Sequence, residues 1–416
     1  MTFILDKLRY FFVFITTRGL LFFAPLVIAN YISIEQYGIL EWSFAFATIL
    51  ASVLAFGTNS LVPLVSTGIA PPGVTFKSIY FHHLLMVVAA MALVLLLINS
   101  DKALIVLLLF MAVALRSLYS IKFKSIAQPE KSLIIDSSLF GMMMIVVLVV
   151  DAFNSGYEYQ SIWIFTSLYS AVLVIILVAL YFNLNSVHER IQWKHALIAG
   201  APLMISGVIS TLVITSGKLG IGLFFEEKVM GEYAFLSRVG ALPIVLYQII
   251  IVSIFREIFT KSEYELGNLC FKIMLLIVVG VPVIWVMSPY LDHIFGNVFR
   301  TLFEGNSSAL YLLLTQSLLW CGIALNDLVN SRFKTARSVL NWTAPTLFLL
   351  LVVTFIFINL NDYGMNAFII AHSIIILVFF SVQSVTMFFK GVKLLKFWLL
   401  SVSSYIFLTL TAVFIG

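Results

Sequence analysis

The sequence predicts an all-α integral membrane protein with many membrane-spanning helices. Of its 416 residues, 62% are hydrophobic and only 10% are charged. The mean hydropathy is +1.10, and 38 phenylalanines are spread along the chain. A soluble protein cannot bury that much apolar surface in its core, so the helices must lie in lipid.

Thirteen apolar runs are long enough to cross a bilayer, since a span needs about twenty such residues. The runs lie near 10–31, 38–66, 79–98, 102–122, 133–153, 160–183, 196–222, 231–255, 268–289, 308–330, 340–359, 365–388 and 396–415. The first run has full length and no small-residue cleavage pattern, so we expect a retained span rather than a signal peptide. The last run leaves open whether the chain has twelve, thirteen or fourteen spans.

The basic residues predict the orientation of these spans. With the N-terminus inside, the outer loops hold only Lys102, Lys228 and Arg300, and most of the 24 basic residues fall in the inner loops or at inner span ends. This asymmetry is the positive-inside pattern and predicts a cytoplasmic N-terminus. The basic residues are spread singly between apolar runs, so the net charge of +5 does not indicate a nucleic-acid surface.

A weak internal repeat predicts two halves. The segment 34–38 has an acidic residue followed by tyrosine and glycine, and the segment 227–233, about half a chain later, again combines acidic residues with glycine and tyrosine. Paired halves that enclose a central site are a common transporter plan. We therefore expect an N-terminal lobe over 1–194, a C-terminal lobe over 195–390, and an additional hydrophobic helix over 391–416.

Four basic residues fall inside predicted spans: Arg18, Arg116, Lys218 and Arg238. A charge at the centre of a membrane helix costs roughly 2.5 kcal/mol or more unless it faces a cavity or a partner. Such side chains can also reach the nearest interface or pair with an acid. Because few acids lie inside the spans, we expect that internal pairing does not account for all four. An excess of buried cations suits an anionic substrate.

The seventh predicted span carries a polar face. Thr211, Thr215 and Lys218 are spaced to share one side of a helix, and Ser206 and Ser210 extend that side. The face is consistent with a cavity lining. On this evidence alone helix packing is favoured over a site, because membrane helices use the same small hydroxyl residues to pack against each other.

Candidate acids for ion coupling are Asp327, Asp136 and Glu41. Each lies near a predicted interface, where an ordinary solvated carboxylate is the alternative. Cys270 and Cys321 form no paired motif, the six histidines are scattered, and no phosphate-binding GxxxxGK[ST] motif occurs. We therefore expect neither a metal site nor a cofactor, and no enzymatic activity.

Several features together resemble the Wzx-type O-antigen flippases of the multidrug/oligosaccharidyl-lipid/polysaccharide exporter superfamily. They are the early arginine Arg18, the S-x-E-x-Y-G hairpin at 33–38, the phenylalanine-rich helices and the repeat of the hairpin pattern at 227–233 in the second half. The resemblance covers the whole chain in topology, but only this first hairpin in recognisable residues. It implies two six-helix lobes of the MATE-like kind around a cationic cavity, with alternating access that is coupled to an ion.

The resemblance also implies a function and a place. Such proteins lie in the bacterial inner membrane and move undecaprenyl-diphosphate-linked oligosaccharide units from the cytoplasmic to the periplasmic leaflet, as part of lipopolysaccharide biosynthesis and polysaccharide export. Arg18 would then bind the diphosphate or an anionic sugar, with Arg116, Lys218 and Arg238 as supporting cations. The expected partners are this lipid-linked glycan and membrane lipids; association with a polysaccharide polymerase complex stays open.

Three other functions remain alternatives. A multidrug exporter of the same superfamily would need carboxylates in its cavity to bind cationic drugs. An O-antigen polymerase or membrane glycosyltransferase would need long outward loops that carry arginines, and the longest predicted outer loop, near 290–307, is short. An amino-acid permease would need glycine-rich breaks in its first and sixth spans, and the sixth has no glycine.

Overall fold

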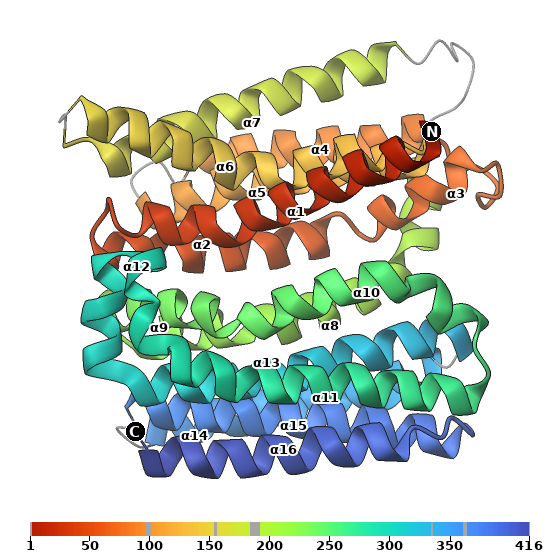
Figure 1. Cartoon of the computed structure of the whole chain (residues 1–416). Helices are drawn as coiled ribbons and strands as arrows, with labels where there is room; N and C mark the ends of the chain where they lie inside the picture. Colours follow the sequence, from red (N-terminus) through yellow and green to blue (C-terminus); the bar gives the residue numbers. More distant parts are fainter. Residues whose placement is uncertain are drawn as a thin grey trace. The chain divides into compact units, whose positions relative to one another are not determined.

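The computed structural model describes residues 2–96, 101–153, 156–183, 192–333, 336–360 and 364–415. Within these ranges the chain is helical and contains no strand (Figure 1). It divides into two compact units, Met1–Leu219 (unit 1) and Gly220–Gly416 (unit 2). The lobe boundary near residue 194 that the sequence predicts concerns the membrane topology, and it stays a prediction.

Unit 1 is built around one buried helix, α5 (Asp101–Ser125), which is the most completely buried span of this unit. It packs against the helices on either side of it in sequence and against α2 and α7. The other helices of the unit are α1 (Thr2–Ile28), α2 (Ile34–Leu54), α3 (Val62–Ser66), α4 (Phe76–Leu96), α6 (Pro129–Ala152), α7 (Glu158–Phe182) and most of α8 (Trp193–Phe224).

Unit 2 is built around α13 (Asn297–Phe333), the most buried span of that unit. The helix α13 packs against α9, α10, α11, α15 and α16. The helices around it are α9 (Glu227–Gly240), α10 (Leu242–Thr260), α11 (Glu263–Met287), the short α12 (Asp292–Phe295), α14 (Ala336–Leu360), α15 (Met365–Phe389) and α16 (Leu395–Ile415).

The two units follow the same plan internally. In unit 1, α5 packs on α2, α4 and α7, and α6 packs on α7. In unit 2, α13 packs on α9 and α10, on α11 and on α15, and α14 packs on α15. These are the pairings expected if span n of the first half corresponds to span n + 6 of the second. The internal repeat seen in the sequence therefore has a structural counterpart.

The second predicted span, 38–66, ends earlier than expected. Its helix α2 stops at Leu54, and a 3₁₀ turn (Thr58–Leu61) and α3 follow. Phe56 and Gly57 have φ values of 50° and 70°, in the left-handed region. A Cβ on Gly57 would lie only 2.1 Å from the carbonyl oxygen of Gly200 in α8. The apolar run is thus broken by a close approach of two backbones, which hydropathy does not reveal.

Other predicted spans are bent rather than broken. The helix α8 bends by 42° between its segments Leu203–Ile209 and Thr211–Phe224. The predicted span 231–255 is formed by α9 and α10, which meet at Ala241. The helix α13 carries a non-helical residue, Asn306, with φ −143° and ψ 40°.

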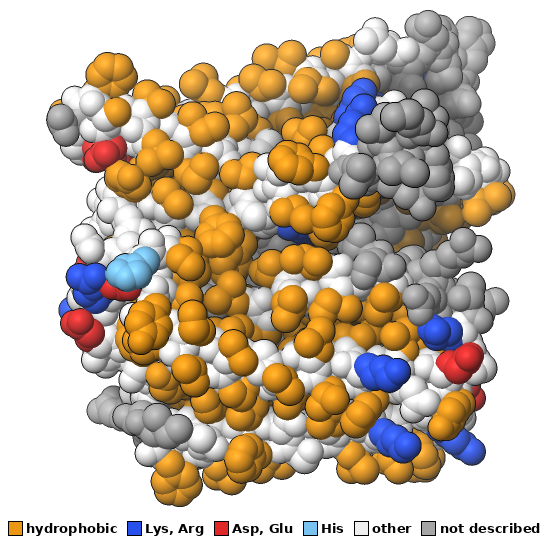
Figure 2. Space-filling view, in the orientation of Figure 1, with side chains coloured by type: hydrophobic (Ala, Val, Ile, Leu, Met, Phe, Trp, Pro, Cys, Tyr) orange, Lys and Arg blue, Asp and Glu red, His pale blue; other side chains and the backbone are white. Residues whose placement is uncertain are grey.

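The apolar helices have the length and composition of membrane spans. Eleven of them qualify outright among the described residues, and the bent α8 raises the number to 12. Apolar side chains cover the middle of the visible helices of unit 2, while charged side chains gather at the helix ends (Figure 2). The chain is therefore a multi-pass membrane protein.

The final hydrophobic run, 396–415, forms α16, which packs against α11 and α13 within unit 2. Phe397 and Ala412, near its two ends, are both fully buried. The helix is thus an integral part of the packing of unit 2 along its whole length, as an additional span would be.

Candidate functional site

Arg18 lies in α1 within an apolar stretch and is partly buried. Its guanidinium carbon lies 5.6 Å from the centre of the Phe14 ring, one turn toward the N-terminus. Its Nε atom is buried and has no hydrogen-bond partner among the described residues. Contact with an aromatic face stabilises a cation by about 0.5–2 kcal/mol but does not neutralise it. Arg18 therefore offers an unused donor inside the bilayer.

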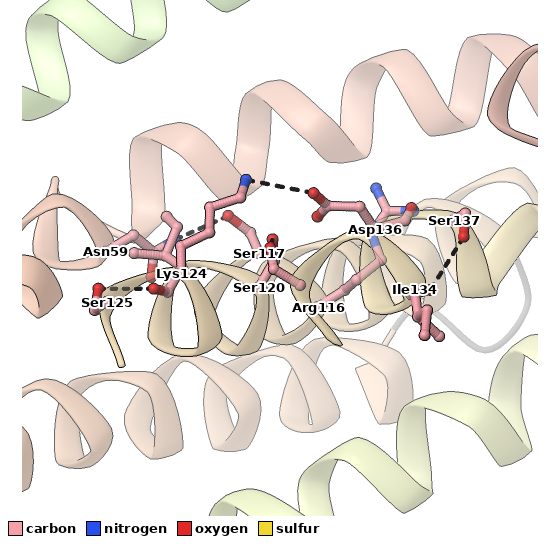
Figure 3. A network of polar contacts seen from close by, with 11 residues as sticks. Asn59, Arg116, Ser117, Ser120, Lys124, Ser125, Ile134, Asp136 and Ser137 are labelled. Atoms are coloured by element: carbon pink, nitrogen blue, oxygen red, sulfur yellow. Dashed lines mark hydrogen bonds and ion pairs between the residues drawn. The ribbon is translucent and has the colours of Figure 1, made fainter. Parts of the chain in front are cut away.

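Arg116 belongs to a polar network between α5 and α6 (Figure 3). Its Nη1 donates to the backbone carbonyl of Asp136 over 3.1 Å, and its guanidinium carbon lies 5.8 Å from the centre of the Phe44 ring. The carboxylate of Asp136 accepts from Lys124 Nζ over 3.4 Å. Asp136 thus contacts two cations, Arg116 through its carbonyl and Lys124 through its carboxylate. Holding this network together is an alternative to the predicted role of Asp136 in ion coupling.

Arg18 and Arg116 lie at nearly the same depth. Two contacts join α1 to α6, Arg9 with Glu130 and Leu20 with Gly141, and in both the partners are 121 residues apart in the sequence. The two helices therefore run parallel. By the same spacing, Arg18 lies level with Leu139 of α6. The contact of Arg116 with the Asp136 carbonyl lies three residues away on α6, which is less than one helical turn. Unit 1 therefore holds two cations at one level.

Lys218 and Glu41 form an ion pair between α8 and α2. The Lys218 Nζ lies 2.5 Å from Glu41 Oε2, with side chains 23% and 0% exposed. Tyr37, one turn earlier on α2, places its hydroxyl 3.5 Å from Glu41 Oε1. Internal pairing thus accounts for Lys218, one of the four predicted cations, and its role in substrate binding stays a prediction. A substrate-binding candidate and an ion-coupling candidate are in contact with one another.

The polar face of α8 is directed at α2 where the structure describes it. Thr211 shares a hydrogen bond of 3.2 Å with Ser52, and Thr215 donates to the Thr211 carbonyl. With Lys218 bound to Glu41, this face makes two polar side-chain contacts with α2. The side chains of Ser206 and Ser210, the other two residues of the predicted face, lie outside the described residues.

Two predicted site residues belong to unit 2. Arg238 lies in the last turn of α9 and is partly buried; its grouping with the cations of unit 1 stays a prediction. Asp327 on α13 is exposed in part, and its Oδ1 accepts from Gln383 Nε2 of α15 over 2.7 Å. Gln383 is 1% exposed and fixes the position of the carboxylate.

Neutral polar groups dominate the interior of unit 2. Asn326 donates to Ser384 over 3.1 Å and accepts from Trp398 Nε1 over 3.0 Å. Further along the same helices, Gln316 contacts His372 at 2.9 Å and donates to Ser373 at 3.0 Å. All of these side chains are buried. The network links α13 to α15 and α16 without buried net charge.

The structure adds residues that sequence reasoning did not single out. Phe44 packs against Arg116, Tyr37 against Glu41, and Gln383 binds Asp327. Tyr37 could have been found, because it lies four residues before Glu41 in the hairpin motif and i, i+4 neighbours share a helix face. Gln383 is a single amide in an apolar run, which is itself a signal of a buried polar contact.

Comparisons with known proteins were made by sequence and by structure. No protein-family profile matches the chain, and no curated protein matches it. A solved chain named protein A is 13% identical with a TM-score of 0.58, over 93% of this chain and 96% of that one. A mutant of the MATE transporter VcmN from Vibrio cholerae is 10% identical with a TM-score of 0.52, over 91% of this chain and 93% of that one.

A third solved structure is an inward-facing multidrug resistance transporter of the MATE family, within the MOP superfamily. It is 12% identical with a TM-score of 0.50, over 95% of this chain and 94% of that one. At such identities the likeness concerns the fold alone. The chain is thus an all-α, multi-pass membrane protein with the fold of the MATE transporters, which confirms the fold class expected from its sequence.

Proposed function

We propose that this protein is a flippase for an anionic lipid-linked oligosaccharide, most simply an undecaprenyl-diphosphate-linked O-antigen repeat unit. The fold supports a membrane transporter. The observation that supports an anionic cargo is Arg18, a cation inside an apolar helix whose buried Nε has no acceptor among the described residues. A guanidinium binds phosphate oxygens through paired, charge-assisted hydrogen bonds.

The charge pattern of unit 1 supports the same assignment. The two acids of unit 1 that were candidates for ion coupling are engaged: Glu41 with Lys218, and Asp136 with Lys124. Arg18 and Arg116, at one level, are left to attract an anion, and attraction between charges is much stronger in a low-dielectric site than in water. In the proposed cycle the diphosphate is drawn from the inner leaflet toward Arg18 and Arg116 while the lipid tail stays in the bilayer. In this proposal the carrier lies in the bacterial inner membrane, and the positive-inside pattern of its sequence supports an N-terminus in the cytoplasm.

A multidrug exporter is the second candidate, because one solved MATE structure of the same fold is described as a multidrug resistance transporter. A cationic drug needs an available carboxylate, and in unit 2 the partly exposed Asp327 could supply one. The two candidates thus differ in the sign of the charge that the cargo must carry.

The test is the fate of lipid-linked units in bacteria that lack this gene. The proposal expects single undecaprenyl-linked units to accumulate on the cytoplasmic side and surface polysaccharide to return with the wild-type gene. If single units reach the periplasm but are not joined into chains, the protein is instead the polymerase. If the deletion strain makes normal surface polysaccharide but is more sensitive to cationic drugs, the protein is a drug exporter.

A further inference from the structure

Two exposed lysines of unit 2, Lys272 on α11 and Lys396 on α16, lie on helix faces that otherwise present apolar side chains. Lys272 shares a face of α11 with Leu276 and Val279, and Lys396 shares a face of α16 with Leu399. These three apolar side chains are all exposed. Exposed apolar faces of membrane spans contact the acyl chains of lipids. Each lysine therefore lies beside a surface that faces lipid.

The turn between α15 and α16 holds these two lysines at similar depths. Its Lys393 donates the backbone N–H to Glu263 Oε1 of α11 over 2.8 Å, and a Cβ on Gly267 of α11 would lie 3.7 Å from the Lys393 carbonyl oxygen. Gly267 is therefore level with Lys393. The helices α11 and α16 begin at this end of unit 2 and pack against each other (Figure 1). Lys272 follows Gly267 by five residues and Lys396 follows Lys393 by three, so their depths differ by less than one helical turn.

The same turn presents two more lysines at the surface. Val392 and Leu394 are 2% and 1% exposed, so these residues anchor the turn in the packing of unit 2. Lys390 and Lys393, in the same turn, are exposed. Basic side chains are visible at this end of unit 2, beside its apolar middle (Figure 2). The lysine patch consists of Lys272, Lys390, Lys393 and Lys396.

The charge of the lysine patch is not neutralised within the described part of the chain. The segments 261–272 and 390–396 contain five lysines and two glutamates, a net charge of +3. Glu263 accepts from the backbone of Lys393, and Glu265 accepts from the N–H and the hydroxyl of Ser262. Among the described residues, no ion pair or hydrogen bond involves the side chain of any lysine of the patch.

Several basic side chains on the predicted cytoplasmic side of unit 1 are, by contrast, engaged within the unit. Arg9 contacts Glu130, and Lys124 contacts the carboxylate of Asp136. The lysine patch lacks such partners, so its charge is left for an anion outside the protein. Lysines next to a bilayer attract anionic lipid headgroups, and a lysine beside acyl chains extends its ammonium to the level of those headgroups.

We propose that the lysine patch binds the headgroup of an anionic phospholipid of the bilayer. A phosphate of this lipid lies between Lys272 and Lys396, and its acyl chains follow the exposed apolar faces of α11 and α16. In the orientation that the sequence predicts, the lipid belongs to the inner leaflet. Because the phosphate contacts both helices, the lipid also fastens the last hydrophobic helix to unit 2. The site is separate from the predicted cargo site in unit 1 and does not depend on the proposed function.

The experiment titrates the purified protein with phosphatidylglycerol and, separately, with phosphatidylethanolamine of the same acyl chains, and counts bound lipids by native mass spectrometry. The wild type should bind phosphatidylglycerol more tightly, because only that headgroup carries a net negative charge. The double variant Lys272→Gln/Lys396→Gln should weaken the tightest phosphatidylglycerol site about 25-fold, since each lysine near an anionic lipid contributes a factor of about five. The double variant Lys272→Arg/Lys396→Arg keeps both charges and should bind as the wild type does.

The matched control is Lys228→Gln, which removes an exposed lysine at the start of α9 in the same unit and should leave the affinity unchanged. Equal affinities of the wild type for the two lipids would overturn the proposal. So would wild-type affinity in the glutamine double variant, or an equal loss in Lys228→Gln. If the glutamine double variant does not fold, each single glutamine variant should weaken binding about fivefold, and no loss in either would overturn the site.

A last arm separates this lipid from the proposed cargo, which is also an anionic lipid. Undecaprenyl diphosphate, added at the same concentration as phosphatidylglycerol, should not displace it from the lysine patch. Displacement that the glutamine double variant abolishes would assign the patch to the cargo and overturn a phospholipid site. None of these outcomes contradicts the proposed function, which the fate of lipid-linked units in the deletion strain tests independently.

Discussion

The two units share one helical plan but differ in the polar contacts that join their helices. Unit 1 carries charges inside its helices: Arg18, Arg116 and the buried pair of Glu41 and Lys218. Unit 2 also carries Arg238 and Asp327 in its helices, but it joins its central helix to α15 and α16 mainly through amides, hydroxyls and an indole. Neutral hydrogen bonds hold helices together, whereas an unneutralised cation is kept in a membrane only at a cost.

Under the proposed function, this difference favours recognition of the cargo by unit 1. The neutral network of unit 2 is satisfied internally and requires no ligand. The charges of unit 1 are balanced only in part, and the imbalance is positive at the level of Arg18 and Arg116. We therefore expect substitutions in unit 1 to change transport and matched substitutions in the network of unit 2 to change stability.

The largest effect is expected at Arg18. Arg18→Ala should lower restoration of surface polysaccharide tenfold or more, because a lost hydrogen bond to a charged group costs about 1.5–3 kcal/mol and about 1.4 kcal/mol is tenfold. Arg18→Lys keeps the charge and should retain partial function. Arg9→Ala is the control, since Arg9 is 69% exposed where it meets Glu130. Full complementation by Arg18→Ala at normal expression would remove Arg18 from the site.

The next effect is on stability and is unequal for the two members of the buried pair. Lys218→Gln removes the cation that contacts the fully buried Glu41 and should lower the free energy of unfolding by about 4 kcal/mol. Glu41→Gln leaves Lys218, which is 23% exposed and can reach toward the interface, so the loss should be smaller. Unfolding in mixed detergent and SDS measures both. Equal decreases in the free energy of unfolding of the two variants would show that the difference in exposure does not affect stability.

Gly57 tests the close approach of the segment after α2 to Gly200 of α8. Gly57→Ala should cost about 1–2 kcal/mol for its left-handed backbone and about 2 kcal/mol more for the clash with the Gly200 carbonyl. Gly68 has a similar φ of 74° but nothing within 4 Å of an added Cβ. Gly68→Ala should therefore show the backbone cost alone, and equal unfolding free energies for the two variants would argue against the close contact.

The smallest effect is expected in unit 2. Trp398→Phe removes the donor to Asn326 and should lower the free energy of unfolding by about 1 kcal/mol while transport per folded molecule stays unchanged. Trp342→Phe is the control, because Trp342 is 66% exposed. A loss of transport in Trp398→Phe without a loss of stability would place this network in the transport machinery and break the contrast between the units.

The sequence predicted most of the fold because membrane spans are determined by length and hydropathy, which are local properties. It placed most of the apolar helices, including the one formed by the last hydrophobic run. It did not predict the break after Leu54, since that break depends on the approach of Gly57 to Gly200, far away in the chain. Non-local backbone contacts leave little trace in a hydropathy pattern.

The candidate site was predicted less completely than the fold. The intramembrane charges were found individually because each interrupts an apolar run. The residues that contact these charges were not predicted. Glu41 and Lys218 were assigned different roles although they are in contact. Pairing depends on register between helices that are remote in sequence, and a single sequence carries no direct signal of that register.

The most direct test is transport by the purified protein in liposomes that carry undecaprenyl-diphosphate-linked oligosaccharide in one leaflet. We expect the wild type to move the glycan to the other leaflet, Arg18→Ala to do so at a tenth of the rate or less, and a cationic drug to be neither moved nor a competitor. Transport of the drug with no movement of the glycan would contradict an anionic cargo and assign the protein to drug export.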